Sequence, residues 1–321
     1  MRVTAHGITI AVTVYNRRDY ILQAIESALS QNKPVRVIVV EDCGPDPGIR
    51  DLVEEHFGNK ISYHRNDVRR GLFGNWNACL DLCTTPWISI LHDDDYLAPH
   101  FVEAMEEIGE ALPDRGIYFS SITHVDNSNR LLQIPVREFP GSFREIDPRA
   151  LAYVNDVLFP GQLLRVDHAR AQGGFRETSQ FCGDWEMWFK LAHYFGAAQT
   201  KKAVAFARSH EGIERGTNKI VRTGRKHALD FVQAKRNLRL IRETQANGFF
   251  DRRIALRKAP LPTRHLLPHA SAMSPRLLRY NVGLLLLSHP PHWRYAVFQF
   301  AVRIFGPRFV LGVSRLFGSM T

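Results

Sequence analysis

Cysteine is scarce in this chain, and long apolar runs are missing. The 321 residues include four cysteines, none of them in a CxxC pair, and scattered cysteines are typical of a reducing cytoplasm. No run approaches the roughly 18 apolar residues that a membrane-spanning helix needs. Residues 1–7 are polar, and the apolar run after them is interrupted at Tyr15, so the sequence predicts no signal peptide. We therefore expect a cytoplasmic protein.

Acidic residues are missing from the C-terminal segment. From Arg252 to Thr321 there are eleven Lys plus Arg and no Asp or Glu, which leaves 31 basic and 32 acidic residues in 1–251. The net charge of +10 therefore belongs to this tail, and the rest of the chain is close to neutral. Because a nucleic-acid-binding domain is usually basic itself, we expect no nucleic-acid partner.

The composition indicates a globular domain followed by that tail. Apolar residues make up 45% of the chain and charged residues 23%, so we expect one domain over 1–250 and a helical, basic, aromatic-rich tail over 251–321. Apolar tail residues at helical spacing, interspersed with arginines, favour a membrane interface on the inner face of the cell membrane. A bundle packed on the domain or a dimer contact fits as well, and the oligomeric state stays open. The apolar series is Phe298, Val302, Phe305, Phe309 and Val313.

Short β-branched runs alternate with helical patterns in the first hundred residues. The runs Ile8–Val14, Val35–Val40 and Trp87–Leu91 are typical of buried strands. Helical patterns separate them, for example over Gly48–Phe57, so we predict an α/β fold with a mostly parallel central sheet flanked by helices. The carboxyl ends of these strands then present Tyr15, Asp42 and Asp93–Asp95 at one edge. We also expect helices over Ala78–Cys83 and Asp147–Leu158 and one more strand over Val204–Ala207.

Three consecutive aspartates, Asp93–Asp95, follow the Trp87–Leu91 run. Adjacent carboxylates repel one another, and hard divalent cations such as Mg²⁺ take carboxylate ligands. The pattern favours a metal site that uses Mg²⁺ or Mn²⁺. A solvated acidic turn before a helix is the alternative, because Asp is favoured there as well.

Four segments in this order resemble the N-terminal half of a family 2 glycosyltransferase of the GT-A fold. They are TVYNRRDYILQAIESALSQ, VIVVEDCGPD, the Asn/Gly segment 66–77 and ILHDDDYLAP. The resemblance implies that Thr13 and Tyr15 line the base pocket of a nucleotide sugar and that Asp42 contacts the base. It also implies that Arg70 or Asn77 helps to hold the nucleotide. The structural alternatives are a turn-opening role for Asp42 and a helix-surface role for Asn77.

The same resemblance identifies the aspartates as the family's metal motif. Alignment on Pro99 places Asp94 at the usual metal-ligand position, with Asp93 beside it as a ligand or donor contact. His92 stands where the first acid of the motif often occurs. Further along, His210 is a candidate to close over the diphosphate or to bind the metal; an ordinary loop histidine is the alternative.

An acidic residue at the start of an aromatic-rich helix is the candidate catalytic base. Asp184 follows Gly183 in CGDWEMWFKLAHYF, after a GGF segment, and this arrangement resembles the family's catalytic-base segment. Sugar transfer with inversion needs one carboxylate to accept the proton of the attacking hydroxyl. Glu186 is the second candidate, and a helix-capping role for Asp184 is the structural alternative.

Together these features predict a metal-dependent, inverting glycosyltransferase. It would move a sugar from a UDP- or dTDP-type donor to a hydroxyl of a glycan or lipid-linked acceptor, in cell-surface polysaccharide synthesis. Two alternatives stay open. One is a noncatalytic glycan- or membrane-binding protein on the same scaffold, since fold does not guarantee activity. The other is a nucleotidyltransferase, although no Gly-rich basic loop follows the first strand.

Overall fold

The computed structural model describes residues 2–134, 138–179, 181–210 and 225–244. The chain divides into two units: Met1–Leu151, Asn155–Ser179 and Gly183–Glu211 form the first, and Ala152–Val154, Gln180–Cys182 and Gly212–Thr321 form the second. The tail over 251–321 and the domain boundary at 250 lie outside the described residues, so both stay predictions. Among the described residues, none of the helices combines the length and apolarity that crossing a membrane requires.

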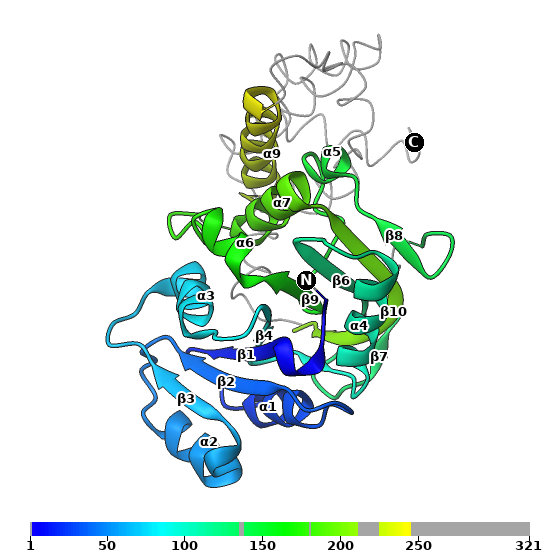
Figure 1. Ribbon diagram of the computed structural model, residues 1–321. Helices are drawn as coiled ribbons and strands as arrows, with labels where there is room; N and C mark the ends of the chain where they lie inside the picture. The colour runs from blue at the N-terminus through cyan, green and yellow to red at the C-terminus, as the bar shows by residue number, and fades with distance from the viewer. Residues whose placement is uncertain (1, 135–137, 180, 211–224, 245–321) are drawn as a thin grey trace, which may run out of the picture. The chain divides into compact units, whose positions relative to one another are not determined.

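The first unit is built on one ten-stranded mixed sheet (Figure 1). The strand order is β3-β2-β1-β4-β9-β6-β10-β5, with β7 paired to β6 and β8 to β10. The strands are β1 Ile8–Val14, β2 Arg36–Glu41, β3 Ser62–Arg65, β4 Trp87–His92, β5 Tyr96–Leu97, β6 Ile117–Val125, β7 Leu131–Leu132, β8 Phe143–Glu145, β9 Gln162–Arg165 and β10 Ala197–Arg208.

Helices cover both faces of this sheet. Of the longer helices, α1 packs on β1 and β2, α3 lies across β1, β2 and β4, and α4 packs on β6 and β10. The α-helices are α1 Ile21–Leu29, α2 Gly48–Phe57, α3 Gly71–Leu82, α4 Phe101–Ala111, α5 Pro148–Leu151, α6 Val166–Ala171, α7 Gly183–Phe195 and, in the second unit, α9 Arg225–Thr244. Two 3₁₀ turns complete the set, η1 Ala5–Gly7 and η2 Gly58–Lys60.

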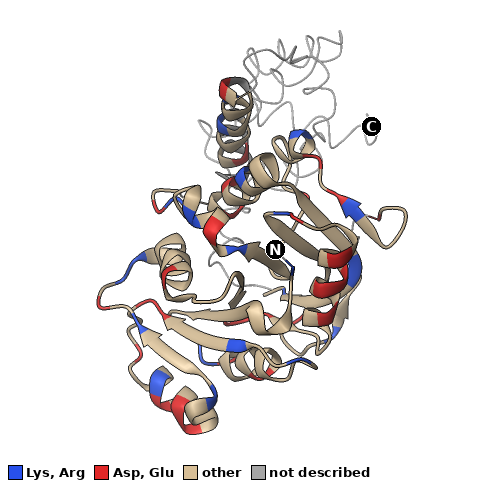
Figure 2. Cartoon of the chain, viewed as in Figure 1, with Lys and Arg blue, Asp and Glu red and all other residues tan. Residues whose placement is uncertain are grey.

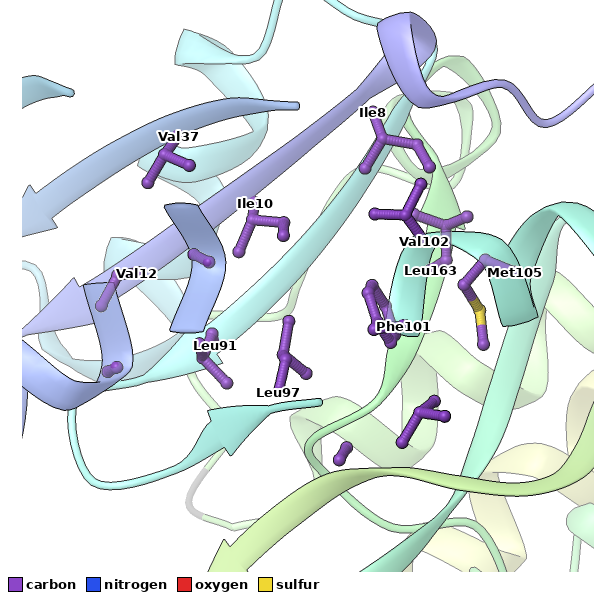
Figure 3. Close-up of a cluster of buried hydrophobic side chains, with 14 of the residues drawn as sticks. Ile8, Ile10, Val12, Val37, Leu91, Leu97, Phe101, Val102, Met105 and Leu163 are labelled. Atoms are coloured by element: carbon purple, nitrogen blue, oxygen red, sulfur yellow. The ribbon is translucent and has the colours of Figure 1, made fainter. Parts of the chain in front are cut away.

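Strand β1 runs through the middle of the core. All seven of its residues are buried, as expected for a parallel strand covered on both faces. Its alternate residues Ile8, Ile10 and Val12 belong to one cluster with Leu91 of β4 and Phe101 of α4 (Figure 3). The β-branched run that predicts this strand therefore also supplies the core on which the sheet edge is held.

Helix α4 shows how the charge is distributed. Phe101, Met105 and Ile108 are fully buried, while the glutamates of the helix face outward, so acidic colour marks its surface (Figure 2). One of them, Glu106, accepts a hydrogen bond from the Ala5 amide at 2.8 Å and pairs with Lys33. Lys, Arg, Asp and Glu are interspersed over the described chain (Figure 2), in line with the near-neutral body read from the sequence.

Several sequence-based boundaries are correct and others are wrong. Helix α2 and strand β4 lie where the patterns predict them, and α/β architecture with mostly parallel pairing in the β3-β2-β1-β4 half is confirmed. The helix expected over 147–158 is wrong, because α5 ends at Leu151. The helix expected from Ala78 begins earlier, at Gly71.

Strand β9 is the main element that the sequence did not reveal. It is antiparallel to both β4 and β6 and joins the two halves of the sheet. Only four residues long, it shows no periodicity that separates it from a loop. Its place in the sheet comes from tertiary pairing.

We expect Leu163→Ala in β9 to destabilise the protein by about 2–5 kcal/mol, because this side chain is fully buried. The matched substitution Leu131→Ala should change the free energy of unfolding by less than about 0.5 kcal/mol, because Leu131 is 71% exposed. Urea unfolding of the three proteins measures both values. Equal costs at the two positions would contradict the position of β9 in the core.

Candidate active site

The carboxyl ends of β1, β2 and β4 meet at one edge of the sheet, because these strands are parallel neighbours. The pairing of Thr13 with His92 brings the end of β1 beside the end of β4. The chain leaves β1 through Tyr15 and leaves β4 through Asp93–Asp95, which we call the aspartate loop. Ligands of open α/β sheets bind at such an edge.

An arginine and a histidine hold the aspartate loop from two directions. Arg17, in the loop after β1, donates from Nη1 to Asp93 Oδ1 at 3.0 Å and also pairs with Asp94 Oδ2. The same Asp94 oxygen lies 2.8 Å from His210 Nε2, just beyond β10. The other ring nitrogen of His210 lies 3.0 Å from Asn127 Oδ1. Asp94 is therefore the carboxylate on which these segments converge.

Arg208 fixes the backbone of the aspartate loop. Its amide donates to Asp95 Oδ1 at 2.9 Å, and its Nε donates to the Asp94 carbonyl at 2.9 Å. The guanidinium also donates to the Asp126 carbonyl at 2.8 Å and lies 4.0 Å from the ring centroid of Tyr20. The side chain is buried, so these contacts tie the loop to β10, to the turn after β6 and to the start of α1.

The ring of His92 lies in an aromatic stack. Its ring is parallel to Phe159 at 4.2 Å and stacks on Trp76 at 5.5 Å. Its Nδ1 lies 3.5 Å from Asp95 Oδ2. The stack fixes the ring plane and turns one nitrogen toward the aspartate loop.

Burial and charged neighbours shift the pKa values of the aspartate loop in opposite directions. Burial raises the pKa of Asp93 to about 7 although Arg17 opposes this. Burial also acts on Asp94, but the hydrogen bond from His210 and the charge of Arg17 prevail and lower its pKa to about 2. Burial likewise opposes a charged His92, yet Asp95 and its neighbours raise the pKa of His92.

The donor set fits a divalent cation. His92, Asp94 and Asp95 each offer a ligand atom, and these atoms lie within 4.8 Å of one another. Carboxylate oxygens are the ligands that Mg²⁺ and Mn²⁺ prefer, and an imidazole nitrogen is compatible with Mn²⁺. A cation would also favour the ionised form of Asp93, whose pKa burial raises. Of the predicted metal residues, Asp94 and His210 are in contact, and the carboxylates of Asp93 and Asp94 are both paired with Arg17.

The residues predicted to bind the nucleotide lie near the ends of β1 and β2. Thr13 donates from Oγ1 to the Leu91 carbonyl at 3.3 Å. The Tyr15 ring has the guanidinium of Arg69 above it, 4.4 Å from the centroid. Asp42 lies at the end of β2, where Asn66 Nδ2 donates to its Oδ1 at 3.2 Å.

Three of the residues predicted to bind the nucleotide, Asp42, Arg70 and Asn77, have structural contacts at helix α3. The two oxygens of Asp42 accept the backbone N–H groups of Arg70 at 2.7 Å and Gly71 at 2.8 Å, so Asp42 caps the start of α3. The side chain of Arg70 itself is exposed. Asn77 donates to the Phe175 carbonyl at 2.8 Å and accepts from its amide at 2.7 Å. Nucleotide binding by Asp42, Arg70 and Asn77 stays a prediction beside these structural roles.

Asp184 begins α7, as predicted, and aromatic contacts connect this helix end to the aspartate loop. A Cβ on Gly183 would lie 2.5 Å from the Phe73 ring, so only glycine fits this close approach. Phe73 packs edge-on against Trp76 at 5.1 Å, and Trp76 stacks on His92. Asp184 is half-buried, in the first turn of the helix.

Glu186 is less accessible than Asp184. Its carboxylate is buried and its Oε1 accepts from Arg176 Nε at 3.1 Å and pairs with Lys190 at 3.1 Å. A general base needs an accessible lone pair next to its substrate. Asp184 is less buried than Glu186, and the choice of either as the base stays a prediction.

Sequence reasoning missed the two arginines of this edge. Arg17 lies two residues beyond Tyr15, and a cation in the loop after β1 is a usable signal once β1 and β4 are known to be neighbours. Arg208 ends a strand of which only residues 204–207 were predicted, whereas β10 spans Ala197–Arg208. Both contacts depend on strand order, which local patterns do not encode.

The comparisons with known proteins agree with this geometry. A family model described as glycosyl transferase family 2 matches residues 9–167. An uncharacterized glycosyltransferase of Rickettsia bellii is 26% identical over 216 residues, which cover 66% of this chain and 31% of that protein. The succinoglycan biosynthesis protein ExoO of Rhizobium meliloti is 36% identical over 107 residues, covering 32% of this chain and 30% of ExoO. The chain thus spans about a third of the length of these curated relatives.

A solved structure supports the fold. TarS of S. aureus, crystallised in complex with UDP-GlcNAc, superposes with a TM-score of 0.59 over 98% of this chain and 93% of that chain. The sequence identity is 17%, so the likeness shows the shared GT-A fold and nothing finer.

We expect the metal-free protein to lose stability as Asp93 ionises. The folded-state pKa of about 7 lies above the unfolded value of 3.8. The folded protein therefore binds this proton more tightly, and the stability gained from it disappears between about pH 4 and pH 7. Asp93→Asn should leave the free energy of unfolding nearly unchanged near pH 4. It should raise it above pH 7, by at most about 4 kcal/mol at about 1.4 kcal/mol per pKa unit.

Urea unfolding in the presence of a chelator, at the two ends of this pH range, measures the difference. Asp46→Asn is the matched control, because the hydrogen bond from Arg18 lowers the pKa of Asp46. Its substitution should destabilise the protein slightly at neutral pH. An Asp93→Asn protein that is no more stable than the wild type above pH 7 would contradict the account of the loop.

Proposed function

Because this chain belongs to glycosyl transferase family 2 through residues 9–167, we propose that it transfers a sugar from a nucleotide sugar to an acceptor hydroxyl. The observation that carries the proposal is the aspartate loop, where carboxylates and histidines gather at the carboxyl ends of β1, β4 and β10. Open α/β sheets bind their ligands at this edge. The protein acts, in this proposal, as a metal-dependent enzyme that inverts the anomeric centre.

Asp94 would hold the divalent metal together with His92 and Asp95, and the other candidate ligands are His210, which contacts Asp94 Oδ2, and Asp93. When bound, Mg²⁺ or Mn²⁺ carries the negative charge of the departing nucleoside diphosphate. The support from this chain is chemical: His92, Asp94 and Asp95 each offer a ligand atom, and these three atoms lie within 4.8 Å of one another. Arg208 keeps the loop in place through the Asp94 carbonyl and the Asp95 carboxylate.

Asp184 is the general base. The acceptor hydroxyl attacks the anomeric carbon, Asp184 takes its proton, and the bond from that carbon to the donor phosphate oxygen breaks. Because attack and departure occur on opposite sides, the configuration inverts. A carboxylate in the first turn of α7 stays ionised near a helix N-terminus, as a base requires.

The nucleoside lies over the ends of β1 and β2. Thr13 and Tyr15 line the base pocket. Asp42 lies at the bottom of this pocket, where it also caps α3. Arg70 or Asn77 contributes to the nucleotide side of the pocket. Because Asn77 donates to the Phe175 carbonyl, it would contribute to the shape of the pocket rather than bind the nucleotide directly.

The donor is UDP- or dTDP-linked, and the acceptor belongs to a glycan or a lipid-linked glycan. The solved relative TarS was crystallised with UDP-GlcNAc, and ExoO is named a succinoglycan biosynthesis protein. These names support a role in cell-surface polysaccharide synthesis. The basic tail over 251–321 attaches the enzyme to the inner face of the cell membrane, where a lipid-linked acceptor would be presented.

We expect Asp184→Asn to lower kcat by about 10²–10⁴-fold with little change in donor KM, because the variant keeps the shape and loses the base. Initial rates with the best nucleotide-sugar donor and Mn²⁺ measure the effect. Asp167→Asn is the matched control, since Asp167 also lies in the first turn of a helix, α6, and binds Arg165 at 2.8 Å. It should keep wild-type turnover. If Asp184→Asn also retains turnover, the assigned base is wrong, and inactivity of every protein with all donors would favour the noncatalytic alternative.

A further inference from the structure

Arg17 forms an ion pair with Asp94, one of the proposed metal ligands. Its Nη1 bonds Asp93 Oδ1 at 3.0 Å and pairs with Asp94 Oδ2, the oxygen that His210 also contacts. The two carboxylates are largely buried, with 13% and 14% of their side chains exposed, whereas Arg17 is 37% exposed. The cation therefore approaches the loop from the solvent side.

A metal ion and this guanidinium compete for the same oxygen. An ion at ligand distance from Asp94 Oδ2 would lie beside a positive guanidinium, and like charges that close repel strongly. The ion pair must open before Asp94 can bind the metal through that oxygen. Arg17 belongs to the loop between β1 and α1, outside regular structure, and its partly exposed side chain has room to leave.

The diphosphate of the nucleotide sugar is a new partner for the displaced guanidinium of Arg17. A divalent ion in such a site is bound by carboxylates together with substrate phosphates, so the diphosphate lies next to the metal. Guanidinium groups bind phosphate oxygens in a bidentate manner and keep their charge. The diphosphate would thus replace Asp94 as the anionic partner of Arg17 once the metal is bound.

We propose that Arg17 neutralises Asp94 until a metal ion binds, is then displaced from Asp94 and binds the diphosphate of the nucleotide sugar. Metal and nucleotide binding are thereby coupled, each favouring the other. This inference rests on the proposed function. It adds that Arg17 binds the diphosphate and that it does so after the metal has bound at the same site.

The test measures Mn²⁺ binding by the signal of the free ion in electron paramagnetic resonance, with and without saturating UDP. The proteins are the wild type, Arg17→Gln, Arg17→Lys and the matched control Arg18→Gln, whose native side chain pairs with Asp46 away from the loop. Without UDP, Arg17→Gln should bind Mn²⁺ about two- to fivefold more tightly, the effect of a partly exposed ion pair. With UDP the gain should shrink or reverse, because glutamine cannot neutralise the diphosphate.

The factor by which UDP tightens Mn²⁺ binding should therefore fall about two- to fivefold in Arg17→Gln, and the reciprocal effect of Mn²⁺ on UDP must fall equally. Arg18→Gln should stay close to the wild type, whereas Arg17→Lys, which keeps the charge but not the bidentate geometry, should fall between the wild type and Arg17→Gln. Unchanged or weaker Mn²⁺ binding by Arg17→Gln without UDP would overturn the inference alone. Tighter binding with an unchanged UDP effect would overturn the diphosphate contact. If the wild type binds no Mn²⁺ even with UDP, the metal site of the proposed function fails, and this inference with it.

Discussion

Charge crowding in the aspartate loop is the constraint on which the rest of the site depends. Three consecutive carboxylates at a buried strand end repel one another and lose solvation, so the structure must bring compensating groups to them. Arg17 comes from the loop after β1, His210 from the end of β10, and the Arg208 amide from the last residue of β10. Arg17 offsets only part of the cost of burying Asp93, and burial raises the pKa of this carboxyl to about 7. A site that is stable yet short of positive charge suits a transient divalent ion.

The strand order makes this convergence possible. Parallel pairing of β1 and β4 aligns their carboxyl ends, and β9, antiparallel to both neighbours, joins that half of the sheet to β6 and β10. The short strand β5 then pairs Tyr96 with Phe206, which brings the chain just after the aspartate loop beside the end of β10. The fully buried β1 and the cluster around Phe101 hold this edge rigidly (Figure 3). Rigid support of this kind is what a site for positioned chemistry requires.

Much of the fold was readable from the sequence, and the contacts within the site were not. β-branched runs and helical periodicity are local signals, so β1, β4 and α2 were predicted close to their bounds. The pairing of Arg17 with Asp93 and Asp94 depends on which strands are neighbours, and the bond of Asn77 to Phe175 joins residues 98 positions apart. Asp42 illustrates the same limit: its position at a strand end was predicted, whereas its cap on α3 follows from the path of residues 66–71.

Thermal unfolding across a panel of nucleotide sugars, with and without Mn²⁺, tests the central claim most directly. A ligand that binds only the folded protein raises its melting temperature, by an amount set by its concentration relative to Kd. If the aspartate loop is a metal-dependent donor site, one class of nucleotide sugar should stabilise the wild type in the presence of Mn²⁺ and much less in its absence. The same ligand should fail to stabilise Asp94→Asn. Stabilisation that is independent of Mn²⁺ and of Asp94, or none from any nucleotide, would contradict the account.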